Sequence, residues 1–300
     1  MLDILGWRIA FWLSAVFGGI GVWLRRSLED SKDFTDNKAA HGETISPLRT
    51  VMTKHWREVL LTVGNTALWT TLFWLSFVWL AAYSEGLTET KAAGDPDDER
   101  DPFLVSLGAQ LFCCLLFPFV GLIADQTGTE MVTTVGMVLT AIAIIPIFIL
   151  LSDGSAFLYT VGQLMLAVLL TLIGAPLPVW MVRQFPVEYR YTGMGISYNL
   201  AQAIFGGPAA AIATALSRVE VIGGYGSQPG LTPAIYIMGV ALFALGVKAY
   251  GWGYQAKRKY ERLLAGGAMG PSTDAAEPLV ATSNGRDGDG GGYGTRDIEG

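Results

Sequence analysis

Residues 59–83 read VLLTVGNTALWTTLFWLSFVWLAAY, a run that contains no Asp, Glu, Lys, Arg or His. An α-helix needs about 20 mainly apolar residues to cross the hydrocarbon core of a bilayer. The run is long enough for this, and as a helix it would satisfy its own backbone polar groups in lipid. The stretch therefore predicts a membrane-spanning helix and, with it, an integral membrane protein.

Outward from this run, six further segments have a comparable length and composition: 6–24, 103–124, 132–151, 157–182, 193–216 and 231–252. Charged residues make up only 15% of the 300-residue chain, whereas about a quarter of the residues in soluble proteins are charged. Arg8 and Lys248 lie near the ends of their segments, where a long side chain can reach the membrane interface. The pattern predicts an all-α membrane protein with seven spans.

The distribution of Lys and Arg between the loops predicts the orientation of these spans. Loop 25–58 carries seven basic residues and is expected to face the cytoplasm. Loop 84–102 carries seven acidic residues and only two basic ones, so it is expected to lie outside. The tail begins with the basic run 257–259 and is again expected inside. Seven spans then place the N-terminus outside and the C-terminus in the cytoplasm, in a membrane expected to be the plasma membrane.

Several classes of function are disfavoured by the composition. There is no basic stripe with interleaved aromatic residues, so nucleic acid is not an expected partner. The two cysteines, Cys113 and Cys114, are adjacent in an apolar run without metal-ligand spacing, and we interpret them as small packing residues. No catalytic triad, metal or phosphate-loop pattern is evident, so we expect no enzyme, no metal and no cofactor. Residues 265–300 are rich in Gly, Asp and Ser and are predicted to be disordered.

Four stretches resemble the metabolite:proton symporters, a branch of the major facilitator superfamily. They match, in order, that family's sixth helix with the following loop, the entry to its seventh helix, its helix 8–9 loop, and its tenth and eleventh helices. The stretches are GWRIAFWLSAVFGGIGVWLRRSLEDSKDF (6–34), PLRTVMTKHWREVLL (47–61), GLIADQTG (121–128) and GAPLPVWMVRQFPVEYRYTGMGISYNLAQAIFGG (174–207). The last stretch is the most specific, and the order and spacing agree from residue 6 to about residue 250.

The resemblance implies that the seven spans are helices six to twelve of a twelve-helix fold, a partial major facilitator superfamily fold. Residues 1–24 would be the last helix of the N-terminal bundle and residues 25–58 the cytoplasmic central loop. Residues 59–254 would be the six-helix C-terminal bundle, and residues 255–300 a disordered cytoplasmic tail. The family's orientation agrees with the one that the loop charges predict independently.

The implied function is proton-coupled symport of a small organic acid or zwitterion by alternating access, with the substrate between two bundles near the midplane. With the first five helices absent, we expect a truncated half that does not transport alone. Its expected partners are the lipid bilayer, a small-molecule substrate, and a complementary N-terminal bundle or a full-length relative. The five central segments contain no carboxylate or histidine, and the resemblance assigns proton coupling to the missing bundle.

Polar residues within the apolar segments are the candidate substrate contacts, because a polar group in a membrane helix tends to face a bundle interior or a water-filled path. Tyr198, Asn199 and Gln202 lie within about one helical turn, and Trp69 follows Asn65 by one turn. We predict that these five residues contact substrate. The alternative is that their hydrogen bonds only join helices to one another.

A second group is predicted to shape the cytoplasmic turns and gate the fold: Asp125, Gly128, Arg183, Glu188, Arg190 and Gly193. The family usually has Glu at the position of Arg183 and Arg at that of Glu188, so we hypothesise a sign-swapped ion pair; independent drift of the two positions is the alternative. Asp125 could cap a helix N-terminus, and Arg190 could bond to helix ends. Where the family has basic residues after Asp125, this chain has Gln126, Thr129 and Glu130, which weakens any charged latch.

Two other functions remain open from the sequence. A seven-helix receptor or photoreceptor would share the predicted orientation, but a retinal protein needs a lysine in the middle of its last span, and Lys248 is near an end. A non-transporting membrane subunit or a relict fragment would need no complete pathway. The sequence names neither the substrate nor the coupling ion.

Overall fold

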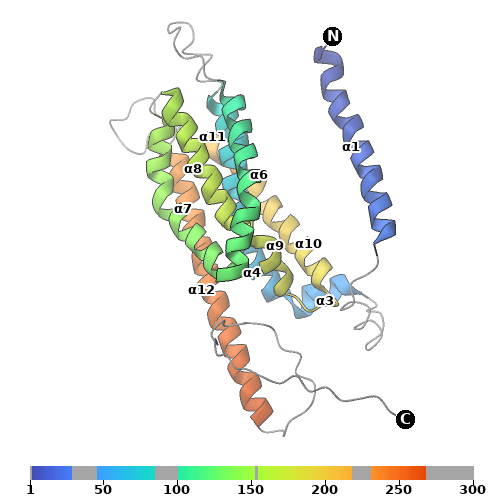
Figure 1. Ribbon diagram of the computed structural model, residues 1–300. Coiled ribbons are helices and arrows are strands. Elements are labelled where there is room, and N and C mark those ends of the chain that lie inside the picture. Colours follow the sequence, from blue (N-terminus) through green and yellow to red (C-terminus); the bar gives the residue numbers. More distant parts are fainter. Residues whose placement is uncertain (1, 29–45, 85–100, 153–154, 218–230, 268–300) are drawn as a thin grey trace, which may run out of the picture. The chain divides into compact units, whose positions relative to one another are not determined.

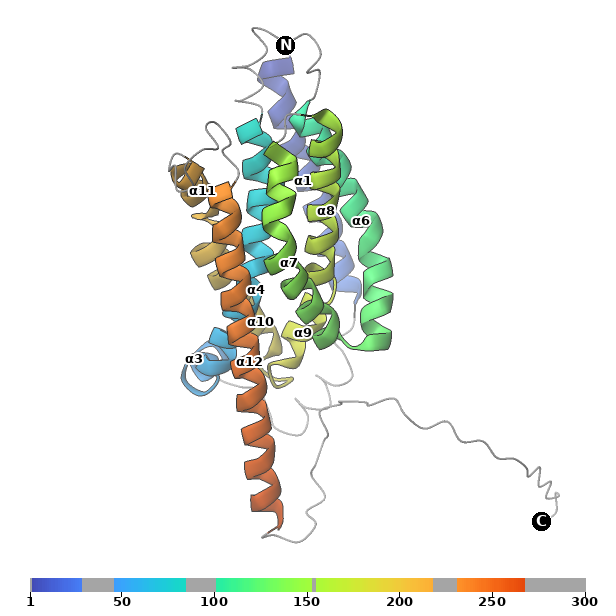
Figure 2. The same cartoon turned by 90° about the vertical axis from the view of Figure 1, so that its left-hand side faces the viewer.

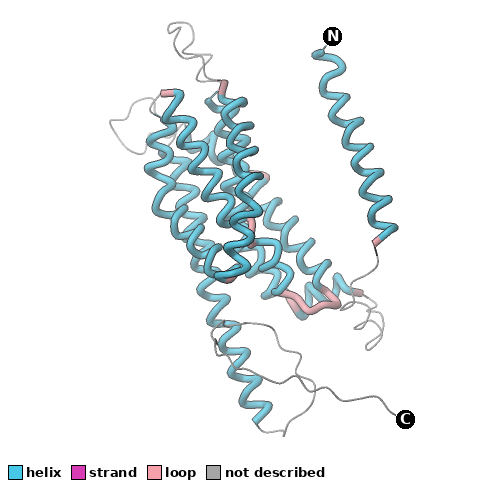
Figure 3. Tube along the Cα trace, viewed as in Figure 1, coloured by secondary structure: helices cyan, strands magenta, loops and turns pink. Residues whose placement is uncertain are grey.

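The computed structural model describes residues 2–28, 46–84, 101–152, 155–217 and 231–267 (Figure 1). These ranges consist of helices and short connections and contain no strand (Figure 3). The all-α prediction is therefore confirmed. Half of the central loop, most of loop 84–102 and residues 268–300 of the tail lie outside the described residues. Residues 255–267, which the sequence assigned to the disordered tail, are helical instead.

The described helices follow the predicted segments closely. Their bounds are α1 (Leu2–Ser27), α3 (Pro47–Lys54), α4 (Trp56–Phe73), η1 (Trp74–Trp79), α6 (Pro102–Thr127), α7 (Thr129–Ser152), α8 (Ala156–Gly174), α9 (Leu177–Arg183), α10 (Arg190–Ala201), η2 (Gln202–Gly206), α11 (Ala209–Ser217) and α12 (Leu231–Gly267), where η1 and η2 are π-helical. Residues 1–253 form one unit, described below, and the end of α12 from Tyr254 onward belongs to a second.

Six of the seven predicted spans are long and apolar enough in the described structure to cross a membrane. They run over 56–84, 102–127, 129–152, 156–183, 190–217 and 231–257. α1 covers the first predicted segment as a 26-residue helix but is not among the six. Because the segments at 129–152 and 190–217 begin earlier than predicted, Glu130 and Arg190 lie inside helices rather than in loops.

Helix α8 packs against both α6 and α7, and α4 packs against α10 (Figures 1 and 2). The centre of the core is aliphatic, and its fully buried side chains include Leu68 and Leu72 of α4, Met137 of α7, and Leu166 and Leu170 of α8. The apolar stretches of α6 and of the span 190–217 are only 22% buried within the chain. Their remaining apolar surface is therefore available to lipid or to another helical bundle.

Small residues set the close approach of α7 and α8. A Cβ placed on Gly136 of α7 would lie 3.0 Å from Leu172, and a Cβ on Gly162 of α8 would lie 2.7 Å from Leu151. Glycine lets two membrane helices meet backbone to side chain, so that dispersion contacts replace the weak hydrophobic drive in lipid. The buried threonines near these contacts, such as Thr140 and Thr171, donate to carbonyls four residues back in their own helices.

Two breaks in the chain position the polar residues discussed below. The span predicted at 157–182 is interrupted, because α8 ends at Gly174 and α9 begins after Pro176. Helices α6 and α7 are joined by one residue, Gly128, whose φ of 98° is favourable only for glycine. The N–H of Gly128 donates to the carbonyl of Ala124 and closes the end of α6.

Candidate functional site

Four polar or aromatic side chains from α4, η1, α10 and η2 form one hydrogen-bonded network. Oε1 of Gln202 accepts from the hydroxyl of Thr70 and, at 3.1 Å, from the indole nitrogen of Trp74. Nε2 of Gln202 donates to the hydroxyl oxygen of Tyr198 at 2.9 Å. The network brings together two of the five predicted substrate contacts, Tyr198 and Gln202, and adds Thr70 and Trp74.

The chemistry of the donors fixes the direction of these bonds. An indole N–H can only donate, so the oxygen of the Gln202 amide must face Trp74 and its NH₂ must face Tyr198. The Tyr198 oxygen therefore accepts, and its own O–H is left to donate elsewhere. Tyr198 and Trp74 are each 37% exposed. The arrangement presents one oriented O–H donor beside an exposed indole ring.

The backbone departs from the α-helix where this network lies. Trp74 begins η1 and Gln202 begins η2, and the N–H of Gly207 bonds to the carbonyl of Gln202 at 2.7 Å in the five-residue π pattern. Pro208 follows directly and has no N–H to continue the α-helical ladder. Such π segments are rare and occur mostly at functional sites.

Gly206 allows these helices to meet. A Cβ at this position would lie 2.5 Å from the Thr70 hydroxyl oxygen and 2.9 Å from the Trp74 indole nitrogen.

Asn65 and Trp69 lie one turn apart on α4, as the sequence predicts, and therefore share a face. Asn65 is 1% exposed, and both polar atoms of its side chain lack a hydrogen-bond partner. Trp69 packs on Gly174, where a Cβ would lie 2.0 Å from the indole, and edge-on against Phe117. Asn199 is exposed, and its amide donates to the carbonyl of Gly195 in its own helix. These three residues do not join the Gln202 network.

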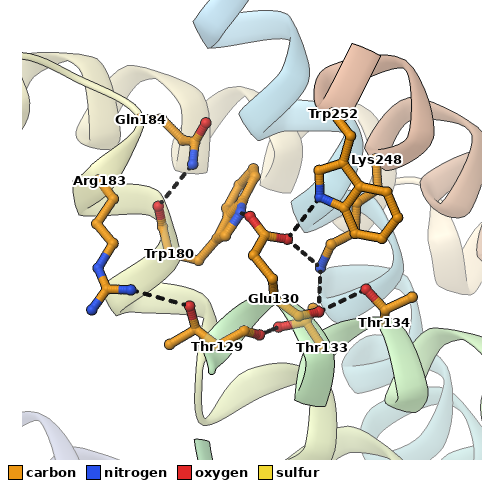
Figure 4. A network of polar contacts seen from close by, with 9 residues as sticks. All are labelled: Thr129, Glu130, Thr133, Thr134, Trp180, Arg183, Gln184, Lys248 and Trp252. Atoms are coloured by element: carbon orange, nitrogen blue, oxygen red, sulfur yellow. Dashed lines mark hydrogen bonds and ion pairs between the residues drawn. The ribbon is translucent and has the colours of Figure 1, made fainter. Parts of the chain in front are cut away.

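A second polar cluster joins α7, α9 and α12 (Figure 4). The Glu130 carboxylate accepts from the indole nitrogen of Trp180 at 2.5 Å, from Nζ of Lys248 at 3.2 Å and from the indole nitrogen of Trp252 at 3.3 Å. Nζ of Lys248 also donates to the backbone carbonyl of Glu130 at 3.2 Å. Lys248 is 4% exposed, so it does not reach out to the interface as the sequence suggested: its ammonium is held inside by Glu130.

The predicted gating residues lie around this cluster and the neighbouring turn. Arg183 donates to the hydroxyl of Thr129 at 3.5 Å. Among the described residues there is no ion pair between Arg183 and Glu188, so the hypothesised sign-swapped pair is absent from this structure. Asp125 is exposed in the last turn of α6, at a helix C-terminus rather than the N-terminus that it would need in order to cap.

Gly193 and Arg190 belong to the start of α10. A Cβ on Gly193 would lie 2.4 Å from the Phe185 ring, so this glycine admits the aromatic side chain of the preceding turn. Nε of Arg190 is buried and has no hydrogen-bond partner. Among the described residues, no group of three or more His, Cys, Asp or Glu side chains could hold a metal ion.

The geometry described so far defines a helical integral membrane protein with hydrogen-bonded polar clusters between its spanning segments. Residues 1–211 match the family model of the Major Facilitator Superfamily, and the chain belongs to that family. This confirms the resemblance on which the expected fold depends. No solved structure matches the chain.

The curated relatives are transporters. The chain is 28% identical to the ectoine/proline transporter ProP of Corynebacterium glutamicum over 79% of its length and 46% of the relative's. It is 25% identical to the proline/betaine transporter of Escherichia coli over 80% of its length and 47% of the relative's. It is 29% identical to the citrate-proton symporter of Klebsiella pneumoniae over 70% and 46%. The chain thus spans about half the length of the curated relatives that it matches.

Proposed function

We propose that this chain forms one wall of the substrate path of a proton-coupled secondary transporter for a small zwitterion or organic acid. The family and its transporter relatives support the class. The observation that carries the substrate class is the Tyr198 hydroxyl, which Gln202 holds with its O–H free to donate. Both zwitterionic and acidic metabolites carry a carboxylate that would accept this bond.

The neighbouring aromatic ring suggests how the two substrate classes would differ. Trp74 is 37% exposed, and an indole face attracts a quaternary or secondary ammonium. A proline-like or betaine-like zwitterion would use both contacts, whereas a dicarboxylate would use only Tyr198. We therefore favour a zwitterion, which is also the substrate class in the names of several relatives.

The remaining parts of the function follow from the alternating-access design of the superfamily. Transport through a site at an interface between bundles needs a second wall, whereas binding to the first wall does not. We propose that a complementary N-terminal bundle, or a full-length relative, supplies that wall and the proton-coupling group, with the N-terminus of this chain outside and its C-terminus in the cytoplasm. Asn65, Trp69 and Asn199 remain proposed substrate contacts, and Asn65, which is 1% exposed, would meet substrate only after the helices around it rearrange.

Binding by the purified full chain in lipid nanodiscs tests the proposal. Radiolabelled proline and glycine betaine are compared with citrate and α-ketoglutarate, each competed with unlabelled ligand. We expect saturable binding of the zwitterions that Tyr198→Phe weakens and that Thr160→Val, a matched removal of one hydroxyl, leaves unchanged. The Thr160 hydroxyl donates only to the Ala156 carbonyl of its own helix. Absence of binding in both substrate classes, or equal binding by Tyr198→Phe, would refute the site.

A further inference from the structure

The Glu130 cluster has the chemistry of an anion site whose occupant belongs to the chain itself. Three donors converge on one carboxylate: the ammonium of Lys248 and the indole N–H groups of Trp180 and Trp252 (Figure 4). Two of these donors, Lys248 and Trp252, are four residues apart on α12 and therefore share a face. Trp180 approaches from α9, so the donors are fixed by two helices other than the one that carries Glu130.

Burial separates the donors from the acceptor. The side chain of Lys248 is 2% exposed, whereas that of Glu130 is 42% exposed. The ammonium thus lies in the interior of the bundle. The carboxylate reaches it from the first turn of α7 and stays partly exposed at the surface of the chain. A buried ammonium needs a compensating anion, but nothing in the donor geometry requires that the anion be covalently attached.

We propose that Lys248, Trp180 and Trp252 form a carboxylate-binding site, that the Glu130 side chain is its tethered ligand, and that a small free monocarboxylate takes the same place when Glu130 is removed or withdrawn. The backbone carbonyl of Glu130 also accepts from Lys248 at 3.2 Å. That contact survives substitution of the side chain and keeps the ammonium in position. The site is separate from the Gln202 network and does not depend on the proposed substrate.

The variant Glu130→Ala makes the proposal testable, because it deletes one carbon and a carboxylate, the heavy atoms of an acetate ion. The purified full chain is unfolded thermally in sodium acetate, in acetamide, and in sodium chloride at the same ionic strength. Acetamide has the shape of acetate without its charge. We expect the Tm of Glu130→Ala to rise with acetate concentration as a binding isotherm requires, and to rise less with acetamide or chloride.

The wild type and two other variants distinguish acetate binding at a vacant site from a general salt effect on Tm. The wild type should show no acetate-specific rise, because the tethered carboxylate has a high effective concentration. Glu130→Gln, which keeps the site filled and removes only the charge, should also fail to respond. The double variant Glu130→Ala with Lys248→Met should lose the response of the single variant, because the ammonium that recognises the anion is gone.

The outcomes decide the proposal in either direction. An equal response of Glu130→Ala to acetate and chloride, or an acetate response that persists in the double variant, would overturn it. Should Glu130→Ala yield no folded protein in chloride, purification in acetate decides instead. Recovery of a monodisperse protein in acetate but not in acetamide supports the site, and equal failure in both counts against it. In ¹⁵N-tryptophan spectra, the indole resonance that Trp180→Phe removes should regain its wild-type position when acetate is added to Glu130→Ala.

Discussion

The indole nitrogen of Trp74 donates to Oε1 of Gln202 at 3.1 Å, and each of these two residues is the first of a π-helical segment. One polar contact thus joins two segments in which the regular α-helical hydrogen bonding is interrupted. In lipid an interrupted ladder is tolerated where neighbouring side chains satisfy the freed groups. Around η1 the side chains of Gln163 and Ser106 donate to the carbonyls of Ser76 and Phe77, at 3.3 and 3.2 Å.

The first prediction separates the two roles of the Gln202 network. Gln202→Leu removes the acceptor of Thr70 and Trp74, leaves two donors unsatisfied, and should lower the free energy of unfolding by about 1–3 kcal/mol. Tyr198→Phe removes the outward donor and the acceptor of one Gln202 N–H, but at an exposed position. It should therefore cost less stability than Gln202→Leu and weaken ligand binding about tenfold. Denaturant unfolding in detergent and ligand titration measure the two effects. Equal loss of stability in both variants would show that the network is purely structural.

Gly206→Ala should destabilise the protein by about 1–3 kcal/mol, because the added methyl group would meet the Thr70 hydroxyl and the Trp74 indole. Gly195→Ala on α10 is the matched control, since a Cβ there has nothing within 4 Å. Because the added methyl group meets no neighbour, this change should stabilise the helix by up to about 1 kcal/mol. The two variants should therefore shift Tm in opposite directions. A shift of the same sign would contradict the close approach at Gly206.

Unequal burial in the Lys248–Glu130 pair predicts unequal costs of breaking it. Glu130→Gln leaves a 2%-exposed ammonium without its anion and should cost about 3–5 kcal/mol. Lys248→Met leaves a carboxylate that is 42% exposed and still accepts from Trp180, so its cost should be smaller. Unfolding free energies of the two single variants and of the double variant measure the difference and the coupling between them. The reverse order would mean that Glu130 is the more buried partner in the membrane.

Gln163 is fully buried and ties α8 to η1, because its amide donates to the Ser76 carbonyl and to the Tyr159 hydroxyl, both at 3.3 Å. Gln163→Leu introduces an apolar side chain of similar size and removes both hydrogen bonds. Leaving the carbonyl without this donor should cost about 1–3 kcal/mol. Thr160 lies three residues before Gln163 on α8 and is only half-buried, so Thr160→Val should be nearly neutral in the same thermal scan. Indistinguishable Tm values would show that water replaces the amide.

The sequence alone predicts the spanning helices well, because their length is set by bilayer thickness and their charges are confined to their ends. Glycine and proline have direct backbone consequences, and both stand where the structure has its break after Gly174 and its close helix contact at Gly206. The helix limits were the weaker part. The segment predicted at 132–151 begins at Thr129, which moves Glu130 into a helix.

The Glu130 cluster shows why side-chain partners are harder to predict. Glu130 and Lys248 are 118 positions apart, and each looked like an isolated end charge. A signal was present, because an acid stood where the family favours a base and a lone base stood in an otherwise uncharged span. Pairing them required knowing that α7 and α12 meet. In the same way, nothing in the sequence indicated that Thr70 and Trp74 would bond to Gln202. Asn199, which was predicted to lie beside Gln202, bonds within its own helix.

Gly128 is the single residue that connects α6 to α7, so this junction has no spare length. Surface connections usually tolerate insertions and deletions, but here a single residue separates two long helices, and Glu130 follows it by only two positions. Each residue of an α-helix corresponds to about 100° of rotation about its axis. A change of one residue in length would therefore turn the carboxylate away from its donors or unwind a helix end. Among homologues, substitutions near this junction should therefore be common, whereas insertions and deletions should be rare.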